Sequence, residues 1–166
     1  CDLLYDDTVP HGGGLSSSAA IEVATALMFA TFHNEKHGIT EPVDMIKMAL
    51  LSQKTENTYC GVNCGIMDQF ASAMGKENHA IMLDCNTLQY KYVPLDLKGC
   101  KIVLSNTKKK HNLGASKYNE RRSQCEEAVK NLKTVLPEIT CLADITPDVL
   151  EANKNVFTDE IIYNRA

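Results

Sequence analysis

Glycines, serines and two carboxylates in the first half of this chain are residues that could take part in phosphoryl transfer. Residues 12–14 are all glycine and residues 16–18 are all serine, and Glu56 and Asp68 follow in LSQKTENTYCG and GVNCGIMDQFASAMGK. Phosphoryl transfer requires groups that bind the phosphate oxygens, a ligand for the accompanying metal, and a residue that orients or deprotonates the accepting hydroxyl. Two carboxylates on separate elements could divide the last two tasks.

The glycine and serine run has two possible interpretations, a flexible linker or a phosphate-binding loop. The run ends where a strongly apolar helix is predicted to begin, so the serines occupy the cap and the first turn of that helix. The first turn of a helix has N–H groups without intrahelical partners and the positive end of the helix dipole, and both attract anions. Serine hydroxyls add donors and a possible oxygen ligand for Mg²⁺. The junction with the helix therefore favours a phosphate-binding loop.

The two commonest phosphate-binding motifs do not fit this loop. A Walker loop requires Gly-Lys followed by Ser or Thr, and no lysine follows these glycines. The dinucleotide motif G-x-G-x-x-G requires a third glycine at the position of Ser17. We therefore expect a different class of nucleotide-binding loop.

Each carboxylate also has an ordinary structural interpretation. Glu56 lies near the end of a predicted amphipathic helix, where most glutamates are solvated, and Asp68 lies at the start of a short helix, where aspartate is favoured. Together with the loop they suggest more, because one could bind the metal while the other acts as a base. An acidic neighbour would raise the pKa of that base.

Helical periodicity predicts three elements around these residues. Residues 16–34 form a central helix with apolar side chains on nearly every face, which predicts that the helix is buried. A second helix runs from 40 to about 57 with Thr40 as its N-cap, and a third, 67–74, ends at Gly75. The residues of the second helix that are expected to face inward are Val43, Ile46, Ala49 and Leu50.

The period then changes to that of extended strands. Three strands are predicted, at residues 79–85, 88–95 and 101–106. Residues 116–135 return to a helical pattern, and two shorter helices follow, one after Thr146 and one after Thr158.

The charge and the cysteines exclude several kinds of protein. A formal net charge of −4 argues against a general nucleic-acid binder, and lysines 108–110 are expected to form a solvated turn. No stretch is apolar enough to span a bilayer, and the chain does not begin with a signal-peptide pattern. The seven cysteines form no CxxC pair, which argues against a zinc site or a disulfide framework. Cys85 and Cys100 are expected to be small buried hydrophobes in a protein of the reducing cytoplasm.

Three segments resemble the GHMP small-molecule kinases, and two of them resemble the galactokinase family within that superfamily. PHGGGLSSSAA is similar to the second GHMP motif, P-x-G-x-G-L-S-S-S-A, which wraps the phosphates of ATP. GVNCGIMDQFAS is similar to the sugar-binding segment of galactokinases, and SNTKKKHNLGASKYNERRSQCEEAV is similar to their later segment. The segments stand in the family's order and spacing, and the resemblance covers residues 5–130.

The resemblance implies how ATP and its metal would be bound. Ser18 and Glu56 would bind Mg²⁺. The residues that would bind the ATP phosphates are Gly12, Gly13, Gly14, Leu15, Ser16, Ser17 and Ser18.

The resemblance also implies how the sugar would be bound. Asp68 would be the catalytic carboxylate toward the C1 hydroxyl, and Cys64, Gly65 and Tyr118 would line the sugar pocket with it. Tyr118 could equally be an aromatic residue at the edge of a core, and the sequence alone favours that interpretation.

The fold implied by the resemblance is α+β, in two domains. Residues 1–106 would be part of an N-terminal ATP- and sugar-binding domain that is similar to ribosomal protein S5, and residues 107–166 would begin a ferredoxin-like C-terminal domain. The family's motif G-R-x-N-x-I-G-E-H-T-D-Y and its Gly-rich third motif do not occur in this sequence. We therefore expect an internal fragment of a monomeric enzyme, which is inactive alone and self-associates through uncovered faces.

The function that the resemblance implies is transfer of the γ-phosphate of ATP to the C1 hydroxyl of galactose. The partners are then galactose and ATP, with no nucleic acid and no membrane. Two alternatives are a kinase for a related sugar such as N-acetylgalactosamine and a non-catalytic sensor that binds galactose and ATP. Such sensors lack residues in the Ser-Ala part of the loop, and Ser18 and Ala19 are present here, which disfavours the sensor. A structural domain with a coincidental Gly/Ser turn is weaker still, because Glu56, Asp68 and Tyr118 all lie in matching segments.

Overall fold

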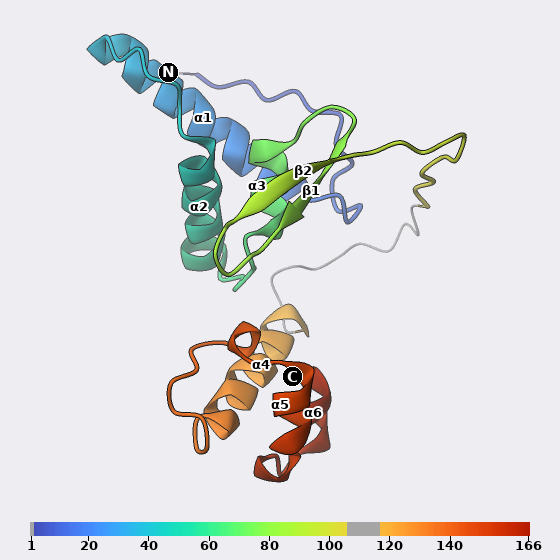
Figure 1. Ribbon diagram of the computed structural model, residues 1–166. Coiled ribbons are helices and arrows are strands. Elements are labelled where there is room, and N and C mark those ends of the chain that lie inside the picture. Colours follow the sequence, from blue (N-terminus) through green and yellow to red (C-terminus); the bar gives the residue numbers. More distant parts are fainter. Residues whose placement is uncertain (1, 106–116) are drawn as a thin grey trace. The chain divides into compact units, whose positions relative to one another are not determined.

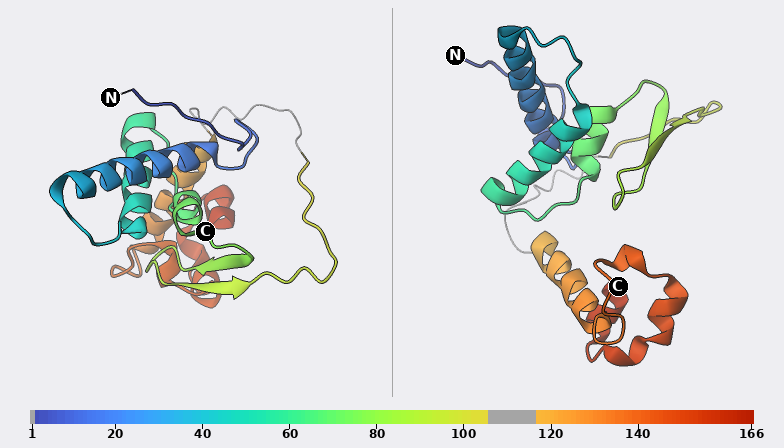
Figure 2. Two further views of the ribbon diagram at one scale, coloured as in Figure 1. Left: turned by 90° about the horizontal axis from the view of Figure 1, so that it is seen from above. Right: turned by 60° about the vertical axis from the view of Figure 1, so that its left-hand side comes forward.

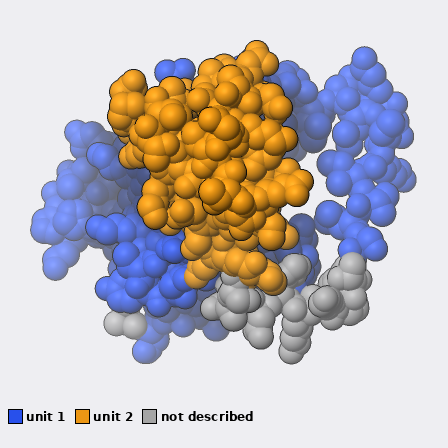
Figure 3. Space-filling model, turned by 90° about the horizontal axis from the view of Figure 1, so that it is seen from below, with its two compact units in different colours: residues 1–112 blue, residues 113–166 orange. Residues whose placement is uncertain are grey.

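The computed structural model describes residues 2–105 and 117–166 and contains both helices and strands (Figure 1), as predicted for an α+β chain. The chain divides into unit 1, residues 1–112, and unit 2, residues 113–166 (Figure 3). Each unit is described by itself below. The domain boundary predicted at residue 106 lies outside the described residues.

Helix α1, Ser17–His37, begins directly after the glycine and serine loop and ends at Gly38. Gly38 has a φ of 64°, a left-handed conformation that glycine adopts without steric cost. Only Ala19 and Val23 of this helix are buried. The prediction of a buried central helix is therefore wrong for the described residues, although the helix itself is confirmed.

Helix α2, Met45–Thr55, begins at Asp44, whose Oδ1 accepts from the N–H groups of Ile46 and Lys47 at 3.1 Å each. The predicted N-cap at Thr40 is wrong. The residue before a proline is held in an extended conformation, so the chain at Pro42 does not enter the helix, and Asp44 satisfies two N–H groups of the first turn instead. Two predicted inward-facing residues have different outcomes, since Ala49 is fully buried and Leu50 is exposed.

A single π-helical turn, Glu56–Cys60, continues α2, and helix α3, Met67–Met74, follows after a loop. Helix α3 ends at Gly75, as predicted. Its residue Phe70 joins Ile66 and Ala49 in the hydrophobic core of unit 1. The partly buried side chains packed on that core are Ile46, Ala73, Met74, Ile81, Leu83 and Leu88.

Strands β1, His79–Leu83, and β2, Tyr90–Pro94, form an antiparallel hairpin in which His79 pairs with Pro94 and Leu83 with Tyr90. The hairpin turn is held by Asp84, whose Oδ1 accepts from two backbone N–H groups at 2.8 and 3.2 Å. These hydrogen bonds lower the pKa of the Asp84 carboxyl. The prediction of a third strand is wrong for residues 101–105, which are not in a strand, and residue 106 lies outside the described part.

Two cysteines that were expected to be buried in strands, Cys85 and Cys100, are exposed. Cys85 lies in the hairpin turn, and Cys100 follows β2 in an irregular segment. The prediction is wrong because neither residue belongs to a paired strand.

Within unit 1, helix α3 lies between α1 and the hairpin (Figure 2, left). Helices α1, α2 and α3 all contact one another. Of the helices in residues 2–105 and 117–166, none has the length and apolar character that a membrane crossing requires.

Unit 2 consists of helices around α4, Lys117–Leu132. Ala128 and Leu132 of α4 are fully buried. The last helix, α6, Glu160–Arg165, packs against α4, and Arg165 Nε donates to Gln124 Oε1 at 3.0 Å. Between them lie the 3₁₀ turns Leu142–Asp144 and Lys154–Val156 and helix α5, Pro147–Ala152.

Candidate active site

The loop before α1 turns back through two glycines with positive φ. The N–H of Gly13 donates to the carbonyl oxygen of Pro10 at 3.2 Å, which closes the turn. Gly12 and Gly14 have φ values of 66° and 75°. A side chain at either position would strain the backbone, because residues with a Cβ rarely adopt this conformation. These two glycines therefore specify the shape of the turn that leads into α1.

Helix α1 begins without a side-chain cap. Ser16 at the N-cap position has a left-handed backbone, with φ of 57°, and its hydroxyl makes no capping hydrogen bond. Its carbonyl oxygen accepts from the N–H of Ala20 at 3.0 Å. The N–H groups of Ser17, Ser18 and Ala19 precede that hydrogen bond, at the helix end where an anion could accept from them.

The carboxylate of Glu56 is the point at which three segments of unit 1 meet. Ser18 Oγ, in the first turn of α1, donates to Glu56 Oε1 at 3.2 Å. Glu56 Oε2 accepts from Gln69 Nε2 at 2.6 Å and from Cys64 Sγ at 3.5 Å. Glu56 itself is only 7% exposed. The expectation that most glutamates at such a position are solvated does not hold here.

Among the described residues, the donors to this buried carboxylate are neutral groups. Within the part of the chain that the structure describes, no lysine, arginine or histidine forms an ion pair with Glu56. Burying a charge is costly unless a counter-charge or several hydrogen bonds compensate it. A bound cation would add a counter-charge to these hydrogen bonds.

Ser18 and Glu56 have the ligand chemistry that Mg²⁺ prefers. Mg²⁺ binds oxygen atoms, and in nucleotide sites it is held by one or two protein ligands together with phosphate oxygens and water. The described residues contain no group of three or more His, Cys, Asp or Glu that could hold a metal by themselves. The hydroxyl and the carboxylate therefore fit an ion that arrives with phosphates better than a permanently bound metal.

Cys64 is a hydrogen-bond donor in this site. Its single S–H proton is shared between Glu56 Oε2 and Asn57 Oδ1, the latter at 3.3 Å, and its carbonyl oxygen accepts from Gln53 Nε2 at 3.1 Å. Burial and then the negative charge of Glu56 raise the pKa of the Cys64 thiol to about 11. The thiol is therefore protonated at neutral pH, which does not suit a nucleophile.

Two neighbouring residues of α3 have opposite environments. Asp68 is exposed, whereas Gln69 is 1% exposed and donates to Glu56. Successive side chains on a helix point about 100° apart, so one turn of α3 can present Asp68 outward and Gln69 inward. The structure thus brings the side chains of Ser18 and Cys64 into direct contact with Glu56. Asp68 is linked to this cluster only as the residue before Gln69, which also contacts Glu56.

Gly65 and Tyr118 are the remaining predicted sugar contacts. Gly65 lies in the loop that precedes α3, and it is exposed. Tyr118 lies in the first turn of α4 in unit 2 and is about half-exposed. Because Tyr118 belongs to the other unit, its place in the sugar pocket stays a prediction.

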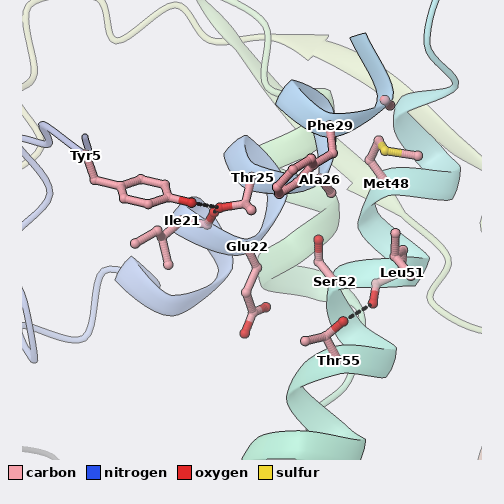
Figure 4. Close-up of a pocket in the computed structure, with 11 residues that line it drawn as sticks. Tyr5, Ile21, Glu22, Thr25, Ala26, Phe29, Met48, Leu51, Ser52 and Thr55 are labelled. Carbon is pink, nitrogen blue, oxygen red and sulfur yellow. Dashed lines mark hydrogen bonds between the residues drawn. The ribbon is translucent and has the colours of Figure 1, made fainter. Parts of the chain in front are cut away.

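Glu22 belongs to the same cluster, and sequence reasoning missed it. It lies one turn after Ser18 on α1, in a groove of about 660 Å³ between α1 and α2, and in Figure 4 it extends from α1 toward the part of α2 that carries Ser52 and Thr55. Burial and then the charge of Glu56 raise the pKa of Glu22 to about 7, and a hydrogen bond with Gln69 partly opposes this. The available signal was a lone glutamate inside the apolar run AAIEVATALM.

The substitution Glu22→Gln is expected to remove a loss of folding stability that the wild type undergoes as the pH rises. A carboxyl group whose pKa is raised from 4.5 to about 7 in the folded state stabilises the fold fully below pH 4.5, and this contribution is lost as the pH rises through 7. Because the group is partly solvated, we expect a loss of about 1 kcal/mol. Raising the pH from about 5 to 8 should therefore lower the unfolding temperature of the wild type more than that of the variant, as measured by thermal unfolding.

The matched control for this measurement is Glu35→Gln, which removes a carboxylate from an exposed position of the same helix. It corrects for the general effect of one negative charge fewer. Identical pH dependence in the wild type and the Glu22 variant would contradict the environment assigned to Glu22.

Comparisons with known proteins show which proteins this chain resembles. Residues 1–76 match the family model described as GHMP kinases N terminal domain. The galactokinase of Fusobacterium nucleatum is 48% identical over 165 residues, which are 99% of this chain and 41% of that protein. The galactokinase of Clostridium tetani is 46% identical over the same shares. The crystal structure of Lactococcus lactis galactokinase complexed with galactose matches with a TM-score of 0.80 and 37% identity, over 95% of this chain and 39% of that one.

The matches cover only part of each relative and, for the family model, only part of the candidate site. The chain spans about two fifths of the length of the relatives it matches. The family model covers the loop, Glu56 and Asp68 but ends before Tyr118. The resemblance predicted from the three segments is confirmed.

Proposed function

The chain belongs to the GHMP kinase family, and we propose that the full-length protein containing it is a galactokinase, which transfers the γ-phosphate of ATP to the C1 hydroxyl of galactose. The observation that best supports the proposal is the convergence of Ser18 and Gln69 on the buried Glu56 carboxylate. This convergence occurs in a chain that is 48% identical to a galactokinase over almost its whole length.

In the proposed reaction, the loop of residues 12–18 binds the phosphates of ATP. Gly12 and Gly14, with positive φ, form the turn that leads into α1. The N–H groups of the first turn of α1 can then donate to the phosphate oxygens. The absence of a side-chain cap at Ser16 is consistent with this role, because a phosphate oxygen can then accept from the first-turn N–H groups.

Ser18 and Glu56 would hold Mg²⁺ in this proposal. An ion held there would supply positive charge that stabilises the phosphate oxygens during transfer. Glu56 is suited to the task because its carboxylate is fixed by neutral donors and has no ion-pair partner among residues 2–105 and 117–166.

Asp68 would orient the C1 hydroxyl of galactose and accept its proton. The carboxylate is exposed, so a sugar can reach it, and it is carried by the helix that is linked to Glu56 through Gln69. Phosphoryl transfer through a loose transition state asks for positioning more than for a strong base. Cys64, Gly65 and Tyr118 would line the sugar pocket.

The experiment that tests the proposal is a coupled assay of ADP formation with the purified full-length protein, ATP and Mg²⁺. ADP should form when galactose is added, and phosphorus NMR should identify galactose 1-phosphate as the product. Faster turnover of N-acetylgalactosamine would assign the protein to the related sugar kinase. Tight binding of galactose and ATP without any ADP would favour the non-catalytic sensor. Either result would refute the proposal.

A further inference from the structure

Gln69 is almost completely buried, although glutamine is usually found at protein surfaces. Its Nε2 donates to Glu56 Oε2 at 2.6 Å, which is shorter than the bonds that Glu56 accepts from Ser18 and Cys64. The same Nε2 lies 3.7 Å from Cys64 Sγ. Burying an amide costs free energy unless it is hydrogen-bonded, so this donor has a specific partner rather than an incidental one.

An amide is the appropriate donor for a carboxylate that must keep its charge. A lysine or arginine in this place would form an ion pair with Glu56 and would compete with a metal ion for the carboxylate. The amide of Gln69 fixes the carboxylate without neutralising it. Because Ser18 binds Oε1 and Gln69 binds Oε2, the carboxylate group cannot rotate about its terminal torsion without losing one of the two bonds.

The position of the Gln69 amide is itself fixed by packing. Ile66 and Phe70, on either side of it in the sequence, lie in the core of unit 1 with Ala49 of α2. The neighbouring Glu22 carboxyl interacts electrostatically with Gln69, whose amide oxygen has no hydrogen-bond partner among the described residues. The packing of its neighbours Ile66 and Phe70 in the core therefore limits the movement of Gln69.

We propose that Gln69 is a positioning residue, which keeps the Glu56 carboxylate in the orientation in which it binds, together with the Ser18 hydroxyl, the metal ion of Mg²⁺-ATP. The inference rests on the proposed function and gives Gln69 no contact with ATP or sugar. Partners behind a metal ligand commonly change metal affinity by about 10- to 100-fold when they are removed.

The test is Gln69→Met in the full-length protein, because methionine has a similar length and no hydrogen-bond donor. The measurement is a titration with Mn²⁺ in the presence of a non-hydrolysable ATP analogue, in which electron paramagnetic resonance reports the free ion. We expect the dissociation constant of Mn²⁺ to rise about 10-fold. In the assay, the Mg²⁺ concentration for half-maximal activity should rise by a similar factor, while kcat at saturating Mg²⁺ falls much less.

The matched control is Phe70→Leu, the next residue of α3, which is equally buried but makes no hydrogen bond to Glu56. It should lower the unfolding temperature and leave the Mn²⁺ dissociation constant unchanged. If the methionine variant does not fold, Gln69→Asn takes its place, since the asparagine amide is one methylene too short to reach Glu56 and should weaken Mn²⁺ binding in the same way.

A folded Gln69 variant with the Mn²⁺ affinity of the wild type would overturn the inference. Failure of the wild-type protein to phosphorylate galactose would overturn the proposed function instead. The two outcomes are distinguishable because the Mn²⁺ titration requires no turnover of sugar.

Discussion

Asp68→Asn in the full-length protein is expected to lower kcat for galactose phosphorylation by about 10²-fold or more, which is the usual contribution of a general base. Asparagine has the shape of aspartate and can still accept a hydrogen bond from the C1 hydroxyl, but it cannot take the proton. The KM values for galactose and ATP should change little, because the substitution removes an interaction made chiefly in the transition state. Steady-state kinetics with saturating galactose and Mg²⁺-ATP would measure the effect.

The control for this variant is Asp96→Asn, which alters an exposed aspartate in the segment after β2. The kcat of the control should equal that of the wild type. A loss confined to the KM for galactose in the Asp68 variant would contradict the catalytic assignment and leave Asp68 as a sugar-binding group.

Glu56→Gln is expected to raise the Mg²⁺ concentration needed for half-maximal activity by about 10- to 100-fold at least, since changes to groups behind a metal ligand already cost this much. The amide keeps the size of the side chain but removes the charge that would attract the ion. The same substitution should raise the unfolding temperature measured without Mg²⁺, because it removes a buried carboxylate that has no ion-pair partner in the described residues.

A higher Mg²⁺ requirement together with a higher unfolding temperature would distinguish a metal ligand from a residue that merely supports the fold. Glu77→Gln, at an exposed position after α3, is the matched control and should change neither quantity. If Glu56→Gln lowered the unfolding temperature and left the Mg²⁺ dependence unchanged, Glu56 would be a structural residue.

The helices that carry the candidate site could be predicted because their signals are local. Apolar periodicity and a terminal glycine act within one or two turns, and they located α1 and the end of α3 at Gly75. The start of α2 shows the limit of this reasoning. Thr40 and Asp44 are both good caps, and the restriction imposed by Pro42 decides between them.

Strands could be predicted less well, because a strand depends on a partner elsewhere in the chain. Ile102, Val103 and Leu104 have the composition of a strand, yet all three are exposed and the described residues give them no paired neighbour. The hairpin was found because its two strands are joined by a short turn.

The candidate site could be predicted only in part. Ser18 and Glu56 stand in recognisable segments, and the structure brings them into contact. The burial of Glu56 and the contributions of Gln69 and Glu22 could not be predicted, because these side chains meet only when α1, α3 and the turn after α2 are packed together. A buried polar group has no periodic signature in a sequence.

The π-helical turn Glu56–Cys60 makes unit 1 unequally tolerant of insertions and deletions during evolution. A π turn contains one residue more than an α turn. Loss of a single codon from residues 57–60 would let the turn close with ordinary α-helical hydrogen bonds and would shorten the connection to α3 by one residue. Glu56 would keep its place while the approach to α3 changed direction. Length variation among descendants of this gene should therefore accumulate in irregular stretches such as residues 95–100 and avoid this turn.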